Sequence, residues 1–63
     1  MIVKIDLEVL QIAQTNIVDL SKYGIDKETF NSMDEYQRKQ WLFDNVIVHY
    51  DSPCWVIEKI EEV

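Results

Sequence analysis

The first residues of the chain alternate strictly between apolar and polar side chains. The apolar positions are Val3, Ile5, Leu7 and Val9, and the positions between them are Lys4, Asp6 and Glu8. Because successive side chains of a strand point to opposite faces of a sheet, this pattern predicts a strand with one buried and one solvated face. β-prone residues return from Asn16 to Tyr23, so we expect a hairpin in which the polar stretch LQIAQTN connects two strands.

The residues that follow this hairpin predict how the chain leaves the sheet. Gly24 is the only glycine. We expect it to end the second strand, where glycine tolerates a positive φ or a close backbone approach at the least cost. Asp26 stands where its side chain can cap a single helical turn through Thr29 and Phe30.

The stretch FNSMDEYQRKQW, residues 30–41, predicts the start of the main helix. Ser32 at the N-cap and Glu35 three residues later form a capping-box pattern, in which each side chain satisfies one free backbone N–H. From Met33 the predicted helix runs to Tyr50. Pro53 ends it, because the residue before a proline is biased away from helical angles. The segment CWVIEKI, residues 54–60, is rich in β-branched and aromatic residues and predicts a last strand.

A second interpretation stays open for residues 46–50. It ends the helix at Asp44 and Asn45 and makes VIVHY and CWVIEKI a hairpin around residues 51–53. We prefer the longer helix, because three strands around one helix bury more surface per residue than a short helix beside two hairpins. The expected fold is a small α+β domain in the order β-β-α-β, with an antiparallel sheet packed against one helix and residues 1–63 in a single domain.

The predicted helix is apolar on more than one side. At 100° per residue, the stripe that we expect to pack on the sheet comprises Met33, Tyr36, Phe43, Ile47 and Tyr50, with Val46 at its edge. Trp41 and Val48 lie on a different side together with Asp44, and Leu42 projects from nearly opposite the stripe. Either other segments of the domain cover Trp41, or Trp41, Leu42 and Val48 form a surface for a partner or a second copy.

Twelve acidic and six basic side chains give a formal charge of −6. Direct binding of nucleic acid is therefore not expected, since it depends on Lys and Arg neutralising phosphates, and anionic membranes are disfavoured for the same reason. A basic protein surface would be attracted. Asp6 and Glu8, at alternate strand positions, stand roughly 6.5–7 Å apart, comparable with phosphate spacing along one nucleic-acid strand. They are therefore candidate partner-binding residues of a nucleic-acid mimic.

The chain shows no catalytic or cofactor-binding pattern. His49 and Cys54 are the only residues of their kinds, so they provide neither an internal disulfide nor the four ligands of a closed zinc site. A single glycine excludes phosphate-cradling loops of the Gly-rich kind. We therefore expect no enzyme activity, no cofactor and no metal. A lone thiol and an N-terminus without a signal-peptide pattern favour the cytoplasm.

Three features of the chain resemble small accessory proteins of tailed bacteriophages. These are Phe30 after an N-terminal hairpin, the helix start Met33-Asp34-Glu35, and Trp55 in the closing strand CWVIEKI. The long LQIAQTN connection and the single glycine depart from that pattern. The resemblance implies a phage protein without catalysis, of the type that inhibits anti-phage defence systems, including CRISPR systems, in the host cytoplasm.

Two functions follow as expectations. The first is an inhibitor that occludes a basic surface of a bacterial nuclease or effector complex, with acidic residues around an apolar anchor such as Trp41. The second is a structural or assembly module that forms a homodimer through the additional apolar helix face. Small domains of this size usually need a partner subunit, a disulfide or a metal, since their own core supplies only ~3–5 kcal/mol.

Overall fold

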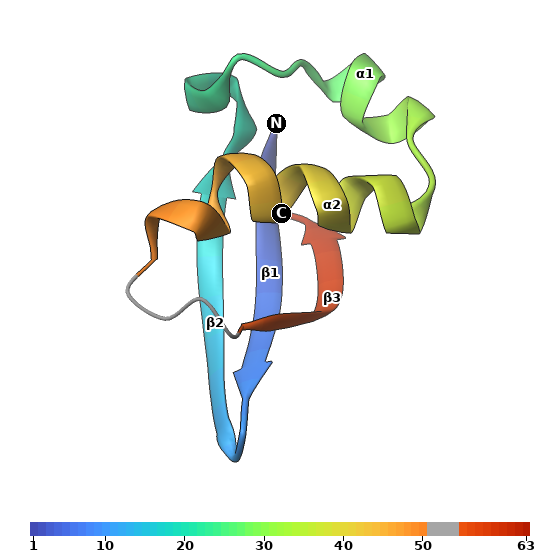
Figure 1. Ribbon diagram of the computed structural model, residues 1–63. Coiled ribbons are helices and arrows are strands. Elements are labelled where there is room, and N and C mark those ends of the chain that lie inside the picture. Colours follow the sequence, from blue (N-terminus) through green and yellow to red (C-terminus); the bar gives the residue numbers. More distant parts are fainter. Residues whose placement is uncertain (51–54) are drawn as a thin grey trace.

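Three antiparallel strands and a helical layer make up the fold in the computed structural model, which describes residues 1–50 and 55–63 (Figure 1). Strand β1 (Ile2–Val9) lies in the middle of the sheet, between β2 (Ile12–Asp19) and β3 (Val56–Glu62). Helix α2 (Glu35–Asn45) crosses one face of this sheet. The predicted α+β class, with an antiparallel sheet packed against one main helix, is confirmed.

Strand β1 pairs through its backbone with a strand on each side. Its alternating side chains bury one face of the strand and leave the other in solvent. Val3, Ile5 and Leu7 are buried towards the helices, and Lys4, Asp6 and Glu8 lie on the opposite face. We call that opposite face the open face of the sheet. It carries no buried residue among those described. β3 pairs with β1 through a bulge, because its register shifts between Asp6 and Leu7.

The hairpin is tighter than the sequence predicted. Val9 pairs directly with Ile12, which leaves Leu10 and Gln11 as a two-residue turn. The second strand therefore spans Ile12–Asp19 rather than Asn16 to Tyr23, so both predicted ends were four residues too late. The reason is tertiary: pairing along the whole length of β1 outweighs the weak strand propensity of the polar residues after the turn.

The residues after β2 form a short 3₁₀ helix, η1 (Leu20–Tyr23). The Asp19 side chain caps it by accepting the backbone N–H of Ser21 at 3.1 Å. Gly24 follows with a φ of +79°, so the expected positive φ is present, but Gly24 ends this helix and not the second strand. Leu20, in contrast, is fully buried in the core.

Two helices lie in this region, where a single turn capped by Asp26 and a helix capped by Ser32 were predicted. Asp26 caps α1 (Lys27–Ser32) by accepting the Thr29 N–H at 2.7 Å, which confirms its predicted role. The predicted capping box of Ser32 and Glu35 was wrong. Ser32 is the last residue of α1, and its hydroxyl donates to the Thr29 carbonyl at 2.7 Å.

The capping box of α2 lies two residues further along. Asp34 accepts the Gln37 N–H at 2.8 Å, and the Gln37 side chain accepts the Asp34 N–H at 3.1 Å. The chemistry is that of the predicted box, with aspartate and glutamine in place of serine and glutamate. Two overlapping patterns of the same spacing were present, and the packing of α1 selected the second.

The main helix ends at Asn45, as the shorter interpretation had it. The predicted helix to Tyr50 was wrong, but the competing strand over residues 46–50 is absent too, because Ile47–His49 form a 3₁₀ helix, η2. The run Val46, Ile47, Val48 is β-branched, which lowers its helix propensity. The predicted stop at Pro53 and the start of the last strand at Cys54 lie outside the described residues, and β3 begins at Val56.

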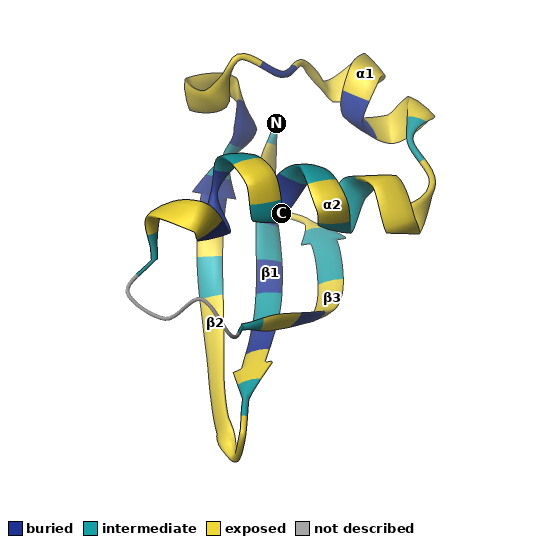
Figure 2. Ribbon diagram, in the orientation of Figure 1, coloured by how far each residue is buried: buried dark blue, intermediate teal, exposed yellow. Residues whose placement is uncertain are grey.

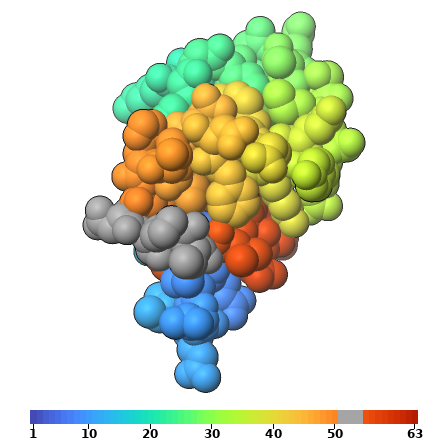
Figure 3. Space-filling view, in the orientation of Figure 1, coloured from blue at the N-terminus to red at the C-terminus, as the bar shows by residue number. Residues whose placement is uncertain are grey.

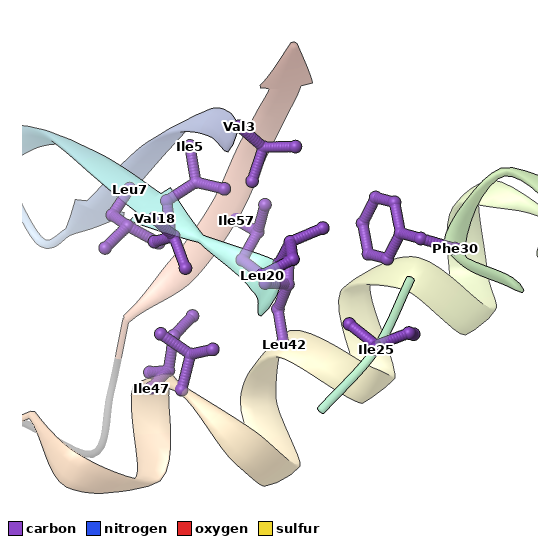
Figure 4. Close-up of a cluster of buried hydrophobic side chains, with 11 residues drawn as sticks. Val3, Ile5, Leu7, Val18, Leu20, Ile25, Phe30, Leu42, Ile47 and Ile57 are labelled. Atoms are coloured by element: carbon purple, nitrogen blue, oxygen red, sulfur yellow. The ribbon is translucent and has the colours of Figure 1, made fainter. Parts of the chain in front are cut away.

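The core lies between the inner face of the sheet and the helices (Figures 2 and 4). Its buried members are Val3, Ile5, Leu7, Val18, Leu20, Ile25, Phe30, Leu42, Val46, Ile47 and Ile57. The predicted helix stripe was right for most of its members, because Val46 and Ile47 are buried and Met33, Phe43 and Tyr50 pack against this core. Leu42 and Val46 face the sheet, one turn apart, whereas Tyr36 is 75% exposed. The expectation that Leu42 projects outwards was therefore wrong.

Arg38 explains why Leu42 was placed on the wrong side of the helix. This residue sits one turn before Leu42, at a position where a periodic pattern would require an apolar side chain. Its guanidinium donates to the Phe30 and Asn31 carbonyls at 3.1 and 3.0 Å and lies 5.7 Å from the centre of the Phe30 ring. Arg38 thus joins α2 to the end of α1 while its stem is half-buried.

Candidate interaction surfaces

Trp41 is half-buried at the margin of the core and is not a fully exposed apolar side chain. Its ring meets Tyr23 and Phe30 edge-to-face, with centroids 6.4 and 6.2 Å apart. Such contacts stabilise a fold beyond the area that they bury. The interpretation in which other segments cover Trp41 is the one that the structure supports, and the covering residues come from η1 and α1.

The remaining edge of Trp41 opens on a shallow groove along α2. The groove is lined by Ser32, Met33, Tyr36, Gln37, Gln40 and Trp41. Tyr36 stands at its rim and is 75% exposed. An apolar contact of the helix with a partner would therefore involve Tyr36 together with part of Trp41, and Leu42 has no part in it.

The other predicted residues of the helix side are accessible. Val48 is 63% exposed on η2, beside a depression lined also by Phe43, Ile47 and Tyr50. Asp44 is exposed and accepts a hydrogen bond from the Gln40 amide at 3.1 Å. Both residues can meet a partner. Asp44 adjoins the groove beside Trp41 through its bond with Gln40, whereas Val48 lies on η2, beyond the end of α2.

Asp6 and Glu8 lie on the open face of the sheet, away from the helices. Asp6 accepts a hydrogen bond from the Thr15 hydroxyl at 2.9 Å and stands opposite Lys59 of β3. Glu8 is exposed. The structure therefore does not bring the six predicted residues together. Trp41, Asp44 and Val48 lie on the helix side, and Leu42 is buried in the core. Asp6 and Glu8 lie on the opposite side.

The open face also carries a charge network between β1 and β3. Glu61 pairs with Lys59 and, at 3.4 Å, with Lys4. The bond from Lys59, together with the charge of Lys4, lowers the pKa of the Glu61 carboxyl. The bond to Glu61 in turn raises the pKa of Lys59. Both lysines of this face are thus held by one carboxylate, while Glu8 makes no ion pair with another described residue.

Most other lysines of the protein are also held in ion pairs with glutamates. Lys27 pairs with Glu62 at 3.1 Å and Lys39 with Glu35 at 3.7 Å. Four of the six basic side chains are therefore paired with three glutamates, and the Arg38 guanidinium donates to backbone carbonyls. Asp19 and Asp26 cap helices, and bonds from Ser21 and Thr29 lower the pKa of these carboxyls. The surplus of carboxylates consequently gives the surface a negative field.

A surface that the sequence interpretation missed follows the hairpin. The hairpin projects beyond the helical layer (Figures 1 and 3). Leu10 at its tip is 88% exposed, and Ile12 and Ile17 on β2 are 60% and 62% exposed. A signal was available, because residues 9–18 form a run of ten uncharged residues in this acidic chain.

The comparisons with known proteins add no relative. No protein-family model, no curated protein and no solved structure matches this chain. Among residues 1–50 and 55–63, no helix has the length and apolar character required to cross a bilayer. In that part of the chain no three His, Cys, Asp or Glu side chains gather in a metal-binding group either.

Proposed function

We propose that this protein is a small acidic binding protein that covers a basic surface of a bacterial nucleic-acid-handling or defence protein. The observation that carries the proposal is the state of its charges. Four of the five lysines are paired with three glutamates, whereas Glu8 is exposed and makes no ion pair with another described residue. A basic partner would therefore meet unopposed negative charge.

The open face of the sheet fits this role better than the helix side. Asp6 and Glu8 alternate along the central strand, so they share a face and follow each other at roughly 6.5–7 Å. The sheet holds both backbone positions rigidly. A row of carboxylates on such a scaffold imitates a phosphate backbone and competes with nucleic acid for a basic groove. The resemblance to phage accessory proteins is in keeping with an inhibitor of this kind.

The function as a self-associating module through the helix face has less support. Leu42 is buried and Trp41 packs against Tyr23 and Phe30. The apolar surface left on α2 is therefore smaller than the sequence implied.

An affinity capture from bacterial lysate tests the proposal. The tagged protein is presented at low and at moderate salt, and captured proteins are identified and purified for direct binding measurements. We expect a basic nucleic-acid-binding protein whose affinity falls as salt rises, because salt screens the attraction between opposite charges.

Two charge variants locate the surface. Glu8→Gln should weaken binding of the captured protein several-fold, whereas Glu28→Gln on α1 removes the same charge from another side of the molecule and should leave binding unchanged. Affinity that does not respond to salt, or an equal loss from both variants, would contradict the proposed use of the open face.

A further inference from the structure

Strand β2 forms one edge of the sheet, and no described strand pairs with its outer side. The outer N–H and C=O groups of an edge strand are free to bond to another strand, and proteins usually guard such an edge with charges, proline or a bulge. From Ile12 to Val18 the strand has no charged residue and no proline. Its register with β1 is unbroken, so no bulge interrupts it.

We propose that β2 pairs with β2 of a second copy of this chain, antiparallel across a two-fold axis. The two three-stranded sheets then form one continuous sheet. A two-fold arrangement uses the same surface on both subunits, so every contact occurs twice. This inference goes beyond the proposed function and does not depend on it, because it concerns an uncharged edge and not the acidic open face.

The charge of the chain indicates why a second copy fits this edge. Two molecules with a net charge of −6 repel each other across most of their surfaces. Eighteen charged residues, six basic and twelve acidic, are spread over the chain, yet residues 9–18 contain none. The edge of β2 is thus where two copies can approach without bringing carboxylates together. A basic partner would gain nothing from this edge.

One end of β2 adjoins an exposed apolar side chain, and the other end borders a hollow. Leu10 projects from the tip next to one end. The other end borders a shallow depression, which is lined by Ile2, Ile17, Lys22 and Tyr23 among others. Antiparallel pairing centred on Thr15 or Asn16, the middle of the strand, places Leu10 of one copy opposite residues 20–22 of the other. The exposed tip of each subunit would then cover the depression of its partner.

Sedimentation analysis over a range of protein concentrations tests this pairing. We expect a reversible monomer–dimer equilibrium in the unmodified protein. Ile17→Lys puts two like charges close to the two-fold axis, which opposes pairing across strands, and should weaken the dimer by about two- to fivefold. Val56→Lys is the matched control, because Val56 is 55% exposed on the other edge strand. It should leave the dimer affinity unchanged.

Salt separates this inference from the proposed function. The dimer should become tighter as salt rises, because salt screens the repulsion between two acidic chains, whereas binding of a basic partner should become weaker. Far-UV circular dichroism of both lysine variants checks that the fold is intact. A protein that stays monomeric at high concentration and high salt would overturn the inference. So would an equal loss of dimer from Ile17→Lys and Val56→Lys, or a dimer that salt weakens.

Discussion

The two edge strands of this sheet are built in opposite ways. β3 (Val56–Glu62) carries Glu58, Lys59, Glu61 and Glu62 and contains a bulge in its pairing with β1. β2 (Ile12–Asp19) has a regular register and no charge before Asp19. Both strands pair with the same central strand. The two edges therefore differ both in the regularity of their pairing with β1 and in the side chains that they present to solvent.

The two proposals assign a different binding role to each of these regions. Charges and a bulge on β3 prevent another strand from adding at that edge, while the carboxylates of the open face remain available for a basic partner. The other edge keeps free hydrogen-bonding groups and exposed apolar residues such as Ile17. In a domain with so small a core, an additional subunit at that edge would also raise stability by mass action.

The largest expected effect is on the free energy of unfolding, and it compares a buried isoleucine on one edge strand with an exposed isoleucine on the other. Ile57 of β3 is 2% exposed, so Ile57→Ala should cost about 2–5 kcal/mol of unfolding free energy through lost burial and a cavity. Ile17→Ala removes a side chain that is 62% exposed and should change it by less than about 0.5 kcal/mol. Urea denaturation at low protein concentration measures both. Equal losses would contradict the burial difference.

A smaller effect, of opposite sign, is expected at the tip of the β2 hairpin. Leu10 has a φ of +55°, a left-handed conformation that costs an ordinary side chain roughly 1–2 kcal/mol and that asparagine tolerates. Leu10→Asn should therefore stabilise the monomer by about 1 kcal/mol and at the same time weaken the dimer. Thermal unfolding of the monomer provides the measurement.

The adjacent turn residue supplies the control for that variant. Among the described residues, Leu10 is the only non-glycine with a positive φ, so Gln11→Asn should bring no gain in melting temperature. An equal gain from both variants would mean that the backbone of Leu10 is not the source.

The smallest expected effect is the contribution of the charged side chains of β3 to stability. Bonds from Lys59 and Lys4 lower the pKa of Glu61, so this carboxylate stabilises the fold above its ordinary pKa of about 4.3, and the stabilisation is lost as pH falls through the lowered value. Glu61→Gln should be slightly less stable at pH 7. Its stability should converge with that of the unmodified protein once the pH falls below the lowered pKa of Glu61.

The effect is small because the ion pairs are exposed and screened by water. Added salt should reduce it further. Glu28→Gln, which removes a carboxylate without an ion pair to another described residue, serves as the control and should show no such convergence. A difference between Glu61→Gln and the unmodified protein that persists in acid would refute the assignment to this charge network.

Local patterns in the sequence determined several features of this protein. The strict alternation of β1 predicted its two faces, since the period of a strand admits only one partition. Asp26 was predicted as a helix cap and Gly24 as a site of positive φ, because each depends on neighbouring backbone groups alone. The α+β class followed from the order of the elements.

The tertiary structure decided what depended on contacts between distant residues. Pairing with β1 placed a tight turn at Leu10 and Gln11, although neither is a usual turn residue. Packing of α2 against the core buried Leu42 and left Tyr36 outside, and Arg38 bonds to the end of α1.

The same division holds for the candidate surfaces. The sequence determined the net charge and the uncharged run, because both depend only on which residues the chain contains and in which order. Only the fold decided that Asp6 and Glu8 lie opposite Trp41, and that the uncharged run forms an edge. Which distant residues lie next to each other depends on packing between segments far apart in the chain, and a local pattern does not determine it.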